Sequence, residues 1–153
     1  MALAADAMLG MANRFKVTIN PANRSLGSWA KASGLDVTFE VPTYYSGEDW
    51  NYVWSFPGKT KFSTIKLVRS AVAKDTPEVK KWLDETAKEF KNHEVTIALH
   101  DAHGLVPVMT WTCVSAFPQK WSIEPFEAGN SKIALETLEI SHGGFLTDQK
   151  KLP

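Results

Sequence analysis

The chain has 153 residues, of which 44% are hydrophobic and 22% are charged. This is the composition of an ordinary globular domain that can bury a sizeable core. Seventeen basic residues balance seventeen acidic ones, so the total charge gives no sign of binding to nucleic acid or to an acidic membrane. The single cysteine, Cys113, excludes an intrachain disulfide and fits a reducing compartment.

The first twelve residues, MALAADAMLGMA, are apolar but too short to span a bilayer, and they lack a basic n-region. We therefore expect synthesis in the cytoplasm without a signal peptide, and no membrane anchor. The chain is predicted to divide into an N-terminal arm (1–12), one β-domain (13–146) and a C-terminal tail (147–153).

Alternation of apolar and polar residues predicts β-strands along most of the chain. The first runs through RFKVTIN, with Phe15, Val17 and Ile19 on one face, and the second through LDVTFEV, from Leu35 to Val41. We expect each strand to bury its apolar face and to leave the other face in water.

Two pairs of later strands are predicted to form hairpins. VTIAL (95–99) and the run 105–113 are separated by the polar turn HDAHG. WNYVWSF (50–56) and KFSTIKLV (61–68) are joined by Pro57-Gly58-Lys59-Thr60.

One segment has helical spacing instead. Between residues 76 and 91 the apolar positions, which end at Phe90, recur every three or four residues. Asp75 or Thr76 can cap the N-terminus, and Pro77 fits the first turn. The sequence therefore predicts one amphipathic helix beside the strands.

The segment Glu136–His142 (ETLEISH) admits two interpretations. As a helix it would place Glu139 and His142 on one face, like the Glu-x-x-His pair of carboxylate-bridged metal sites. The dense aliphatic pattern of KIALETLEIS and the glycines that follow it favour a strand. On a strand Glu136 and His142 share one face and Glu139 points to the other, so the metal site fails on geometry.

Three further motifs favour structural over catalytic roles. Gly58-Lys59-Thr60 resembles the end of a phosphate-binding loop, but Val53 stands where that loop needs glycine and a strand pattern follows it. His100-x-x-His103 is better explained by a polar turn than by zinc ligation. Cys113 lies in register with an apolar face, which predicts a buried thiol and not a nucleophile. We expect no enzyme activity, no cofactor and no metal.

Six tryptophans are many for this length. Trp29 and Trp50 stand in segments that look like loops, where an aromatic side chain would be exposed. Exposed aromatic residues often mark interfaces. This is the first indication that the chain functions through contacts rather than chemistry.

In chain order, these segments resemble the inner tail tube proteins of contractile phage tails and of phage-tail-like contractile injection systems. The similarity runs from about Asn13 to Phe145, through NRFKVTI, SGLDVTFEV, FPGKTKFSTIKLVRS and SAFPQKWSIEPFEAGNSKIALETLEISHGG. The matching positions are Pro57, Gly58, Lys61, Phe62, Leu67, Arg69, Phe117, Pro118, Lys120, Trp121, Gly129, Asn130, Glu136, Thr137, Leu138, Glu139 and His142.

The resemblance implies a mainly β (α+β) fold, an antiparallel β-barrel or sandwich with a flanking helix at about 76–91. It implies a structural protomer: six copies close into a ring, rings stack into a hollow tube, and contraction of a sheath drives the tube through a target envelope with its cargo. The implied partners are further copies of the chain, the sheath protein, baseplate, hub and spike proteins, tape-measure or terminator (cap) proteins, and a luminal protein effector or DNA. The particle can be released outside the cell.

We expect contacts between subunits or rings at the apolar N-terminal arm, at the two loop tryptophans and at charged residues that pair across a subunit boundary. Exposed pairs of that kind contribute up to about 1 kcal/mol each and mainly fix register. The candidate residues are Leu3, Met8, Leu9, Trp29, Trp50, Lys61, Arg69, Glu136, Glu139 and His142.

Two other functions fit the residues. A single-chain β-barrel could carry a small molecule, and it would then be monomeric with a ligand cavity. A hydrolase or metalloenzyme could use the histidine and glutamate residues. Within the tube interpretation, a phage tail, a bacteriocin and an injection particle fit equally well, as do a main tube and a baseplate-proximal ring.

Overall fold

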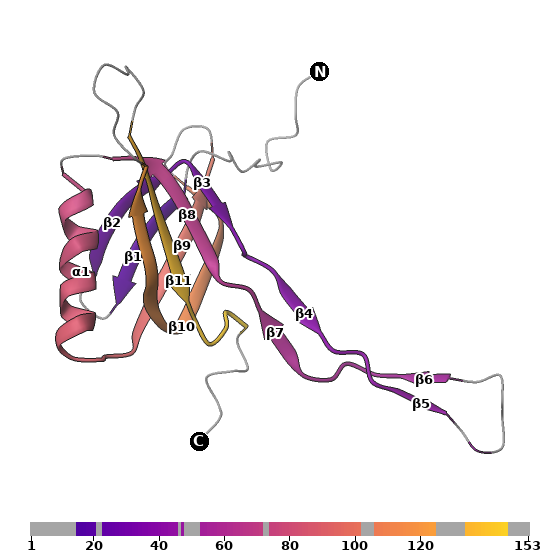
Figure 1. Cartoon of the computed structure of the whole chain (residues 1–153). Helices are drawn as coiled ribbons and strands as arrows, with labels where there is room; N and C mark the ends of the chain where they lie inside the picture. Colours follow the sequence, from indigo (N-terminus) through magenta and orange to yellow (C-terminus); the bar gives the residue numbers. More distant parts are fainter. Residues whose placement is uncertain are drawn as a thin grey trace, which may run out of the picture.

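The computed structural model describes residues 15–20, 23–45, 47, 53–71, 74–101, 106–124 and 134–146. Strands dominate this part of the chain, and a single helix accompanies them (Figure 1). The elements are β1 (Phe15–Asn20), β2 (Arg24–Trp29), β3 (Lys31–Ser33), β4 (Val37–Phe39), β5 (Thr43–Tyr45), β6 (Val53–Ser55), β7 (Thr60–Phe62), β8 (Ile65–Ser70), α1 (Thr76–Lys88), β9 (His93–His100), β10 (Pro107–Ile123) and β11 (Leu135–Ser141).

Seven strands form one antiparallel sheet in the order β2-β1-β9-β10-β11-β8-β3. The two strands at the ends of this order, β2 and β3, are consecutive in the chain, with only Ala30 between them. The Ala30 amide donates to the Val68 carbonyl of β8 at 3.1 Å. The sheet therefore closes on itself through a bend at Ala30, and the predicted β-barrel with one flanking helix is confirmed.

The long strand β10 belongs to both sides of the barrel. It pairs with β9 over Pro107–Ala116 and with β11 over Phe117–Ile123, with a shift in register between Cys113 and Ala116. Ser115 takes a positive φ of 51° at this bulge, which bends the strand. We call β2, β1, β9 and residues 107–116 of β10 the first half-barrel, and residues 117–123 of β10 with β11, β8 and β3 the second half-barrel.

The core lies between the two half-barrels. In β1, β8 and β9 the alternating pattern buries every second side chain for most of the strand, as the sequence predicted. Burial of each large aliphatic side chain contributes about 1.5–3 kcal/mol. The buried apolar residues are Phe15, Val17, Ile19, Leu26, Trp29, Ile65, Leu67, Val79, Trp82, Val95, Ile97, Cys113, Ala116, Leu138 and Ile140.

The predicted helix is confirmed, but it ends at Lys88 rather than near residue 91. Asp75 occupies the N-cap position, and Pro77 lies in the first turn. Val79 and Trp82 enter the core. Phe90 lies beyond the last turn and is 62% exposed, so its predicted place on the buried helical face is wrong. No helix in the described residues is long and apolar enough to cross a membrane.

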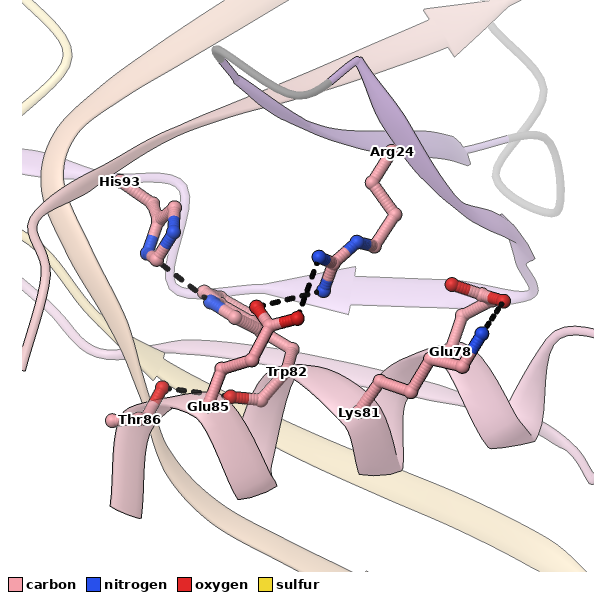
Figure 2. A network of polar contacts seen from close by, with 7 residues as sticks. All are labelled: Arg24, Glu78, Lys81, Trp82, Glu85, Thr86 and His93. Atoms are coloured by element: carbon pink, nitrogen blue, oxygen red, sulfur yellow. Dashed lines mark hydrogen bonds and ion pairs between the residues drawn. The ribbon is translucent and has the colours of Figure 1, made fainter. Parts of the chain in front are cut away.

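Polar contacts hold α1 against the first half-barrel (Figure 2). Both terminal nitrogens of Arg24 on β2 donate to the Glu85 carboxylate, at 3.1 and 2.8 Å, and this hydrogen bonding lowers the pKa of Glu85. Trp82 Nε1 donates to His93 Nδ1 at the start of β9 over 3.4 Å. The helix is thus tied to two strands as well as to the core.

The four remaining strands form a ribbon that projects away from the barrel (Figure 1). β4 pairs with β7, and β5 pairs with β6 further out. The predicted hairpin of 50–56 with 61–68 is therefore wrong. The segment Pro57–Thr60 is not its turn but runs along the ribbon, where Gly58 N donates to Glu40 O at 2.6 Å and Glu40 N to Lys59 O at 2.8 Å.

Candidate assembly surfaces

The projecting ribbon exposes large apolar side chains. Tyr44 and Trp54 face each other across the β5–β6 pair and are 66% and 55% exposed. A ribbon two strands wide has no second layer to cover such side chains, and contiguous exposed apolar surface marks an interaction site. We call this surface the apolar arm, and it consists of Phe39, Val41, Tyr44, Tyr45, Val53, Trp54 and Phe56.

The sequence predicted a buried face for the run 35–41, and for its outer part this is wrong, since Phe39 and Val41 are 45% and 61% exposed. Alternation of apolar and polar residues indicates a strand, but it does not show whether another part of the protein covers the apolar face of that strand. The sequence did contain an indication of this exposure. Aromatic residues are so frequent between Phe39 and Phe56 that a two-stranded ribbon cannot bury them by itself.

Close packing fixes the root of the apolar arm. Gly34 has a φ of +81°, and a Cβ at this position would overlap the Thr64 carbonyl where the chain leaves the barrel and returns to it. Ser63 Oγ donates to Asp36 Oδ1 at 2.6 Å across the same junction. The arm thus leaves the barrel in a direction that depends on a glycine.

His142 links the arm root to the end of β11. Gly144 N donates to its Nδ1 at 3.1 Å, so Nε2 carries the proton and donates to the Ser63 carbonyl at 3.0 Å. Burial lowers the pKa of His142, partly opposed by the bond to Ser63. Its ring also meets Phe62 of β7 edge to face, with centroids 5.6 Å apart.

Arg69 and Glu136 form a buried ion pair, with Arg69 Nε 2.9 Å from Glu136 Oε2 and exposures of 3% and 0%. The expectation that they are exposed and pair across a subunit boundary is wrong. Their positions on β8 and β11 face the barrel interior, in register with each other. They stabilise the subunit from within.

Further contacts extend this pair into a cluster. Thr76 Oγ1 of α1 and Trp121 Nε1 of β10 donate to the Glu136 carboxylate at 3.0 and 2.9 Å. Arg69 Nη1 donates to the Leu26 carbonyl of β2. Sequence analysis missed Thr76 as a member, because only the fold brings α1 beside β11.

Trp29 completes the cluster. The Arg69 guanidinium lies 3.9 Å from the centroid of the Trp29 ring, a cation–π contact inside the barrel. Trp29 belongs to β2 and is 1% exposed, so its predicted place in an exposed loop is wrong. The reason is that Trp29 pairs with Phe15 of β1 on the face of the sheet that is turned towards the core.

The other charged candidates lie at the surface. Lys61 of β7 pairs with Glu40 on the same ribbon, Nζ to Oε1, at 2.7 Å. Glu139 lies on the outer face of β11, on the opposite face from Glu136, as predicted for a strand. Its neighbours in register are Lys66 on β8 and Lys120 on β10. In the part of the chain that the structure describes, no cluster of three potential metal ligands occurs.

The first half of β10 has one edge that no strand among the described residues pairs with, and we call it the open edge. β9 covers one edge of Pro107–Cys113, but pairing with β11 on the other edge starts only at Phe117, after a single bridge between Val114 and Gly144. Met109 is 53% exposed beside this edge. Such an edge can accept another strand.

The remaining candidate interface residues, Leu3, Met8, Leu9 and Trp50, lie outside the described residues.

Comparison with known proteins decides between the functions that fit this geometry. The family model described as T4-like virus tail tube protein gp19 matches residues 11–146, which is most of the chain. The chain belongs to this tail tube family. No curated protein matches it. As a member of this family it is a tail tube protomer, a structural protein rather than an enzyme.

Solved structures share the fold of this tail tube protein. A chain of the PVC sheath–tube complex, from an extracellular contractile injection system, is 21% identical with a TM-score of 0.71, and the match covers 91% of this chain and 93% of that one. A chain of the anti-feeding prophage (AFP) baseplate is 23% identical with a TM-score of 0.66, covering 93% of both chains. A type six secretion system protein is 12% identical with a TM-score of 0.53, covering 86% and 80%.

The interior of the tail tube protein does not resemble that of a carrier. A ligand-binding barrel keeps a cavity of several hundred Å³ among its inward side chains. Here Trp29 and Trp82 fill the space between the half-barrels, at 1% and 0% exposure. A surface pocket of about 210 Å³ lies at the end of α1, lined by Glu85, Lys88, Glu89, Lys91 and His93.

Proposed function

We propose that copies of this tail tube protein close into six-membered rings, that the rings stack into a hollow tube inside a contractile sheath, and that the tube conveys cargo through a target envelope. The apolar arm is the observation that carries this proposal. The barrel has a core of its own, and the apolar arm leaves a large exposed apolar surface that a partner outside the subunit would bury. A second copy of the chain supplies that partner in a homo-oligomer.

The open edge of β10 supports closure of a ring. A strand from a neighbouring copy can pair with Pro107–Cys113 and extend the first half-barrel from one subunit to the next. Repeated around a closed ring, this contact leaves no edge for unwanted pairing.

Stacking differs from ring closure because it is open-ended. A head-to-tail contact between identical rings produces a filament whose length the contact itself does not set. Tape-measure and terminator proteins therefore belong to the proposal, together with sheath, baseplate, hub and spike proteins. In support, relatives with this fold were solved in a sheath–tube complex, in a baseplate and in a tube-terminating cap. The assembled particle acts outside the cell that made it.

The N-terminal arm (1–12) is the proposed contact between stacked rings. It precedes β1 directly and its sequence, MALAADAMLGMA, is apolar. Deletion of Met1–Met11 is expected to slow tube elongation while leaving the unfolding midpoint of the subunit unchanged. Equal elongation rates of the two chains would remove the N-terminal arm from the proposal.

Electron microscopy of the purified, untagged protein tests the proposed function. Negatively stained samples over a concentration series should show six-fold rings or hollow tubes, with the assembled fraction rising with concentration. Monomers at every concentration, also in the presence of a preformed baseplate, would contradict the proposal.

A further inference from the structure

Hydroxyl side chains stand in register on the outer face of the first half-barrel. Thr18 of β1 pairs with Ser25 of β2 and with Thr96 of β9, and Thr96 pairs with Thr112 of β10. One row across four strands therefore consists entirely of serine and threonine. Asn20 Nδ2 donates to Thr96 Oγ1 at 3.2 Å within the same surface.

The next row is also almost uncharged. Lys16 pairs with Ser28 and with Ala98, and Ala98 pairs with Thr110. The second half-barrel differs, because its outer face carries Lys66, Glu139 and Lys120 in adjacent register positions. We call the eight residues of the two rows on the first half-barrel the hydroxyl face: Ser25, Thr18, Thr96, Thr112, Ser28, Lys16, Ala98 and Thr110.

Within the described residues, no helix covers the hydroxyl face. Val79 and Trp82 of α1 join the core cluster, and this cluster lies on the opposite side of the same strands. The arm projects away from the barrel (Figure 1). Lys16, Ser28 and Thr110 are exposed to water. The face is also short of large apolar side chains that a protein partner would bury.

We propose that the hydroxyl face lines the lumen of the tube and forms a hydrated wall with little fixed charge. This inference rests on the proposed function and specifies the surface that cargo meets. The open edge of β10 belongs to the same half-barrel, so ring closure through that edge continues the rows into the next subunit. Six copies would multiply any charge on this wall. The two rows contribute only Lys16, and the neighbouring pair of Asn20 and Glu94 adds one carboxylate of opposite sign.

The chemistry of the wall determines which cargo can pass. A wall rich in lysine or arginine holds a polyanion through salt-dependent contacts, and an acidic wall holds a polycation. Serine and threonine carry no charge and bind water through their hydroxyl groups, so they hold neither a polyanion nor a polycation. The wall therefore fits macromolecular cargo without selection by the sign of its charge.

Cysteine labelling in assembled tubes tests the location of the face. The variants are Lys16→Cys on the hydroxyl face and Lys80→Cys on α1, which remove the same side chain from two exposed positions. Native Cys113 gives no background, because it is fully buried and burial raises its pKa to about 12. Each variant is treated with a small maleimide and with a maleimide attached to a globular protein.

In tubes, the cysteine at position 16 should react with the small maleimide and at least tenfold more slowly with the protein conjugate. The cysteine at position 80 should react with both, and dissociated subunits of both variants should react with both. Tubes whose position 16 reacts with both reagents, or with neither, overturn the inference while the proposed function stands. Failure of the wild-type chain to form tubes overturns both.

Added charge tests the chemistry of the wall. Tubes of Thr110→Lys should bind a fluorescent single-stranded oligonucleotide at low salt and release it as salt increases. Wild-type tubes and tubes of Ala87→Lys, which adds the same charge on α1, should not. Salt-dependent binding of the oligonucleotide by wild-type tubes would contradict the proposal that the wall carries little charge. Equal binding by the two lysine variants would show that the surface around Thr110 lies outside the lumen.

Discussion

Arg69 and Glu136 form an ion pair inside the barrel, in register on neighbouring strands and 2.9 Å apart. Thr76 and Trp121 donate to the same carboxylate, so the pair connects α1 and β10 to β8 and β11. A buried charge that loses its partner keeps its full desolvation cost. The pair therefore adds a buried polar connection between the helix and the two half-barrels, beside the apolar core.

Glu136→Gln should lower the free energy of unfolding by about 3–5 kcal/mol, because the charge of Arg69 then remains buried without a counter-charge. Urea unfolding measures this loss. Glu139→Gln is the matched control, three residues along the same strand on the outer face, and should change stability by no more than about 0.5 kcal/mol. Equal effects of the two substitutions would contradict the structural role of the pair.

Gly34→Ala should destabilise the subunit by at least about 2 kcal/mol, since alanine meets both a positive φ and the Thr64 carbonyl. The comparison is Gly47→Ala, whose added Cβ meets nothing within 4 Å. That substitution should be neutral in thermal unfolding. If Gly34→Ala proves equally neutral, the arm root is not packed as the structure shows.

His142 should make stability depend on pH. Its folded-state pKa is lowered, mainly by burial, so the unfolded chain takes up the proton first as the pH falls. The contribution of the neutral ring is present above the ordinary histidine pKa of about 6.5 and is lost as the pH falls below it towards the folded-state value. Protonation also breaks the bond from Gly144 N to Nδ1.

The measurement is the urea midpoint of the wild-type chain and of His142→Gln at about pH 7.5 and about pH 5. The advantage of the wild type should shrink at the lower pH, while titration of the shared carboxylates cancels in the difference. An advantage that grows on acidification would show that the folded-state pKa is raised instead.

The double substitution Tyr44→Ser and Tyr45→Ser should raise the protein concentration required for tube formation at least tenfold. The stability of the subunit should not change. These side chains are 66% and 69% exposed, so the barrel loses no core contact. Phe90→Ser removes a 62% exposed aromatic residue elsewhere and is the control. Light scattering over a concentration series measures the threshold, and an unchanged threshold in the double variant would exclude the arm from assembly.

Local patterns in the sequence determined the elements of the barrel. The alternation at Phe15–Ile19 and 95–99 and the helical spacing after Thr76 are properties of neighbouring residues, and they predicted β1, β9 and α1. The same reasoning placed Glu136 and Glu139 on opposite faces of one strand and Cys113 in the core. The ordered motifs indicated the tail tube family, which the family model confirms.

Only the tertiary structure decided what each face meets. Alternation made 35–41 look like a strand with a buried face, but Phe39 and Val41 enter a ribbon that no other described element covers. Arg69 and Glu136, which are 67 residues apart in the chain, looked like surface charges until the barrel brought them together. Pairing of Trp29 with Phe15 on the core side of β1 and β2 placed Trp29 inside the barrel. A sequence pattern gives the period of a strand, whereas burial depends on partners that are distant in the chain.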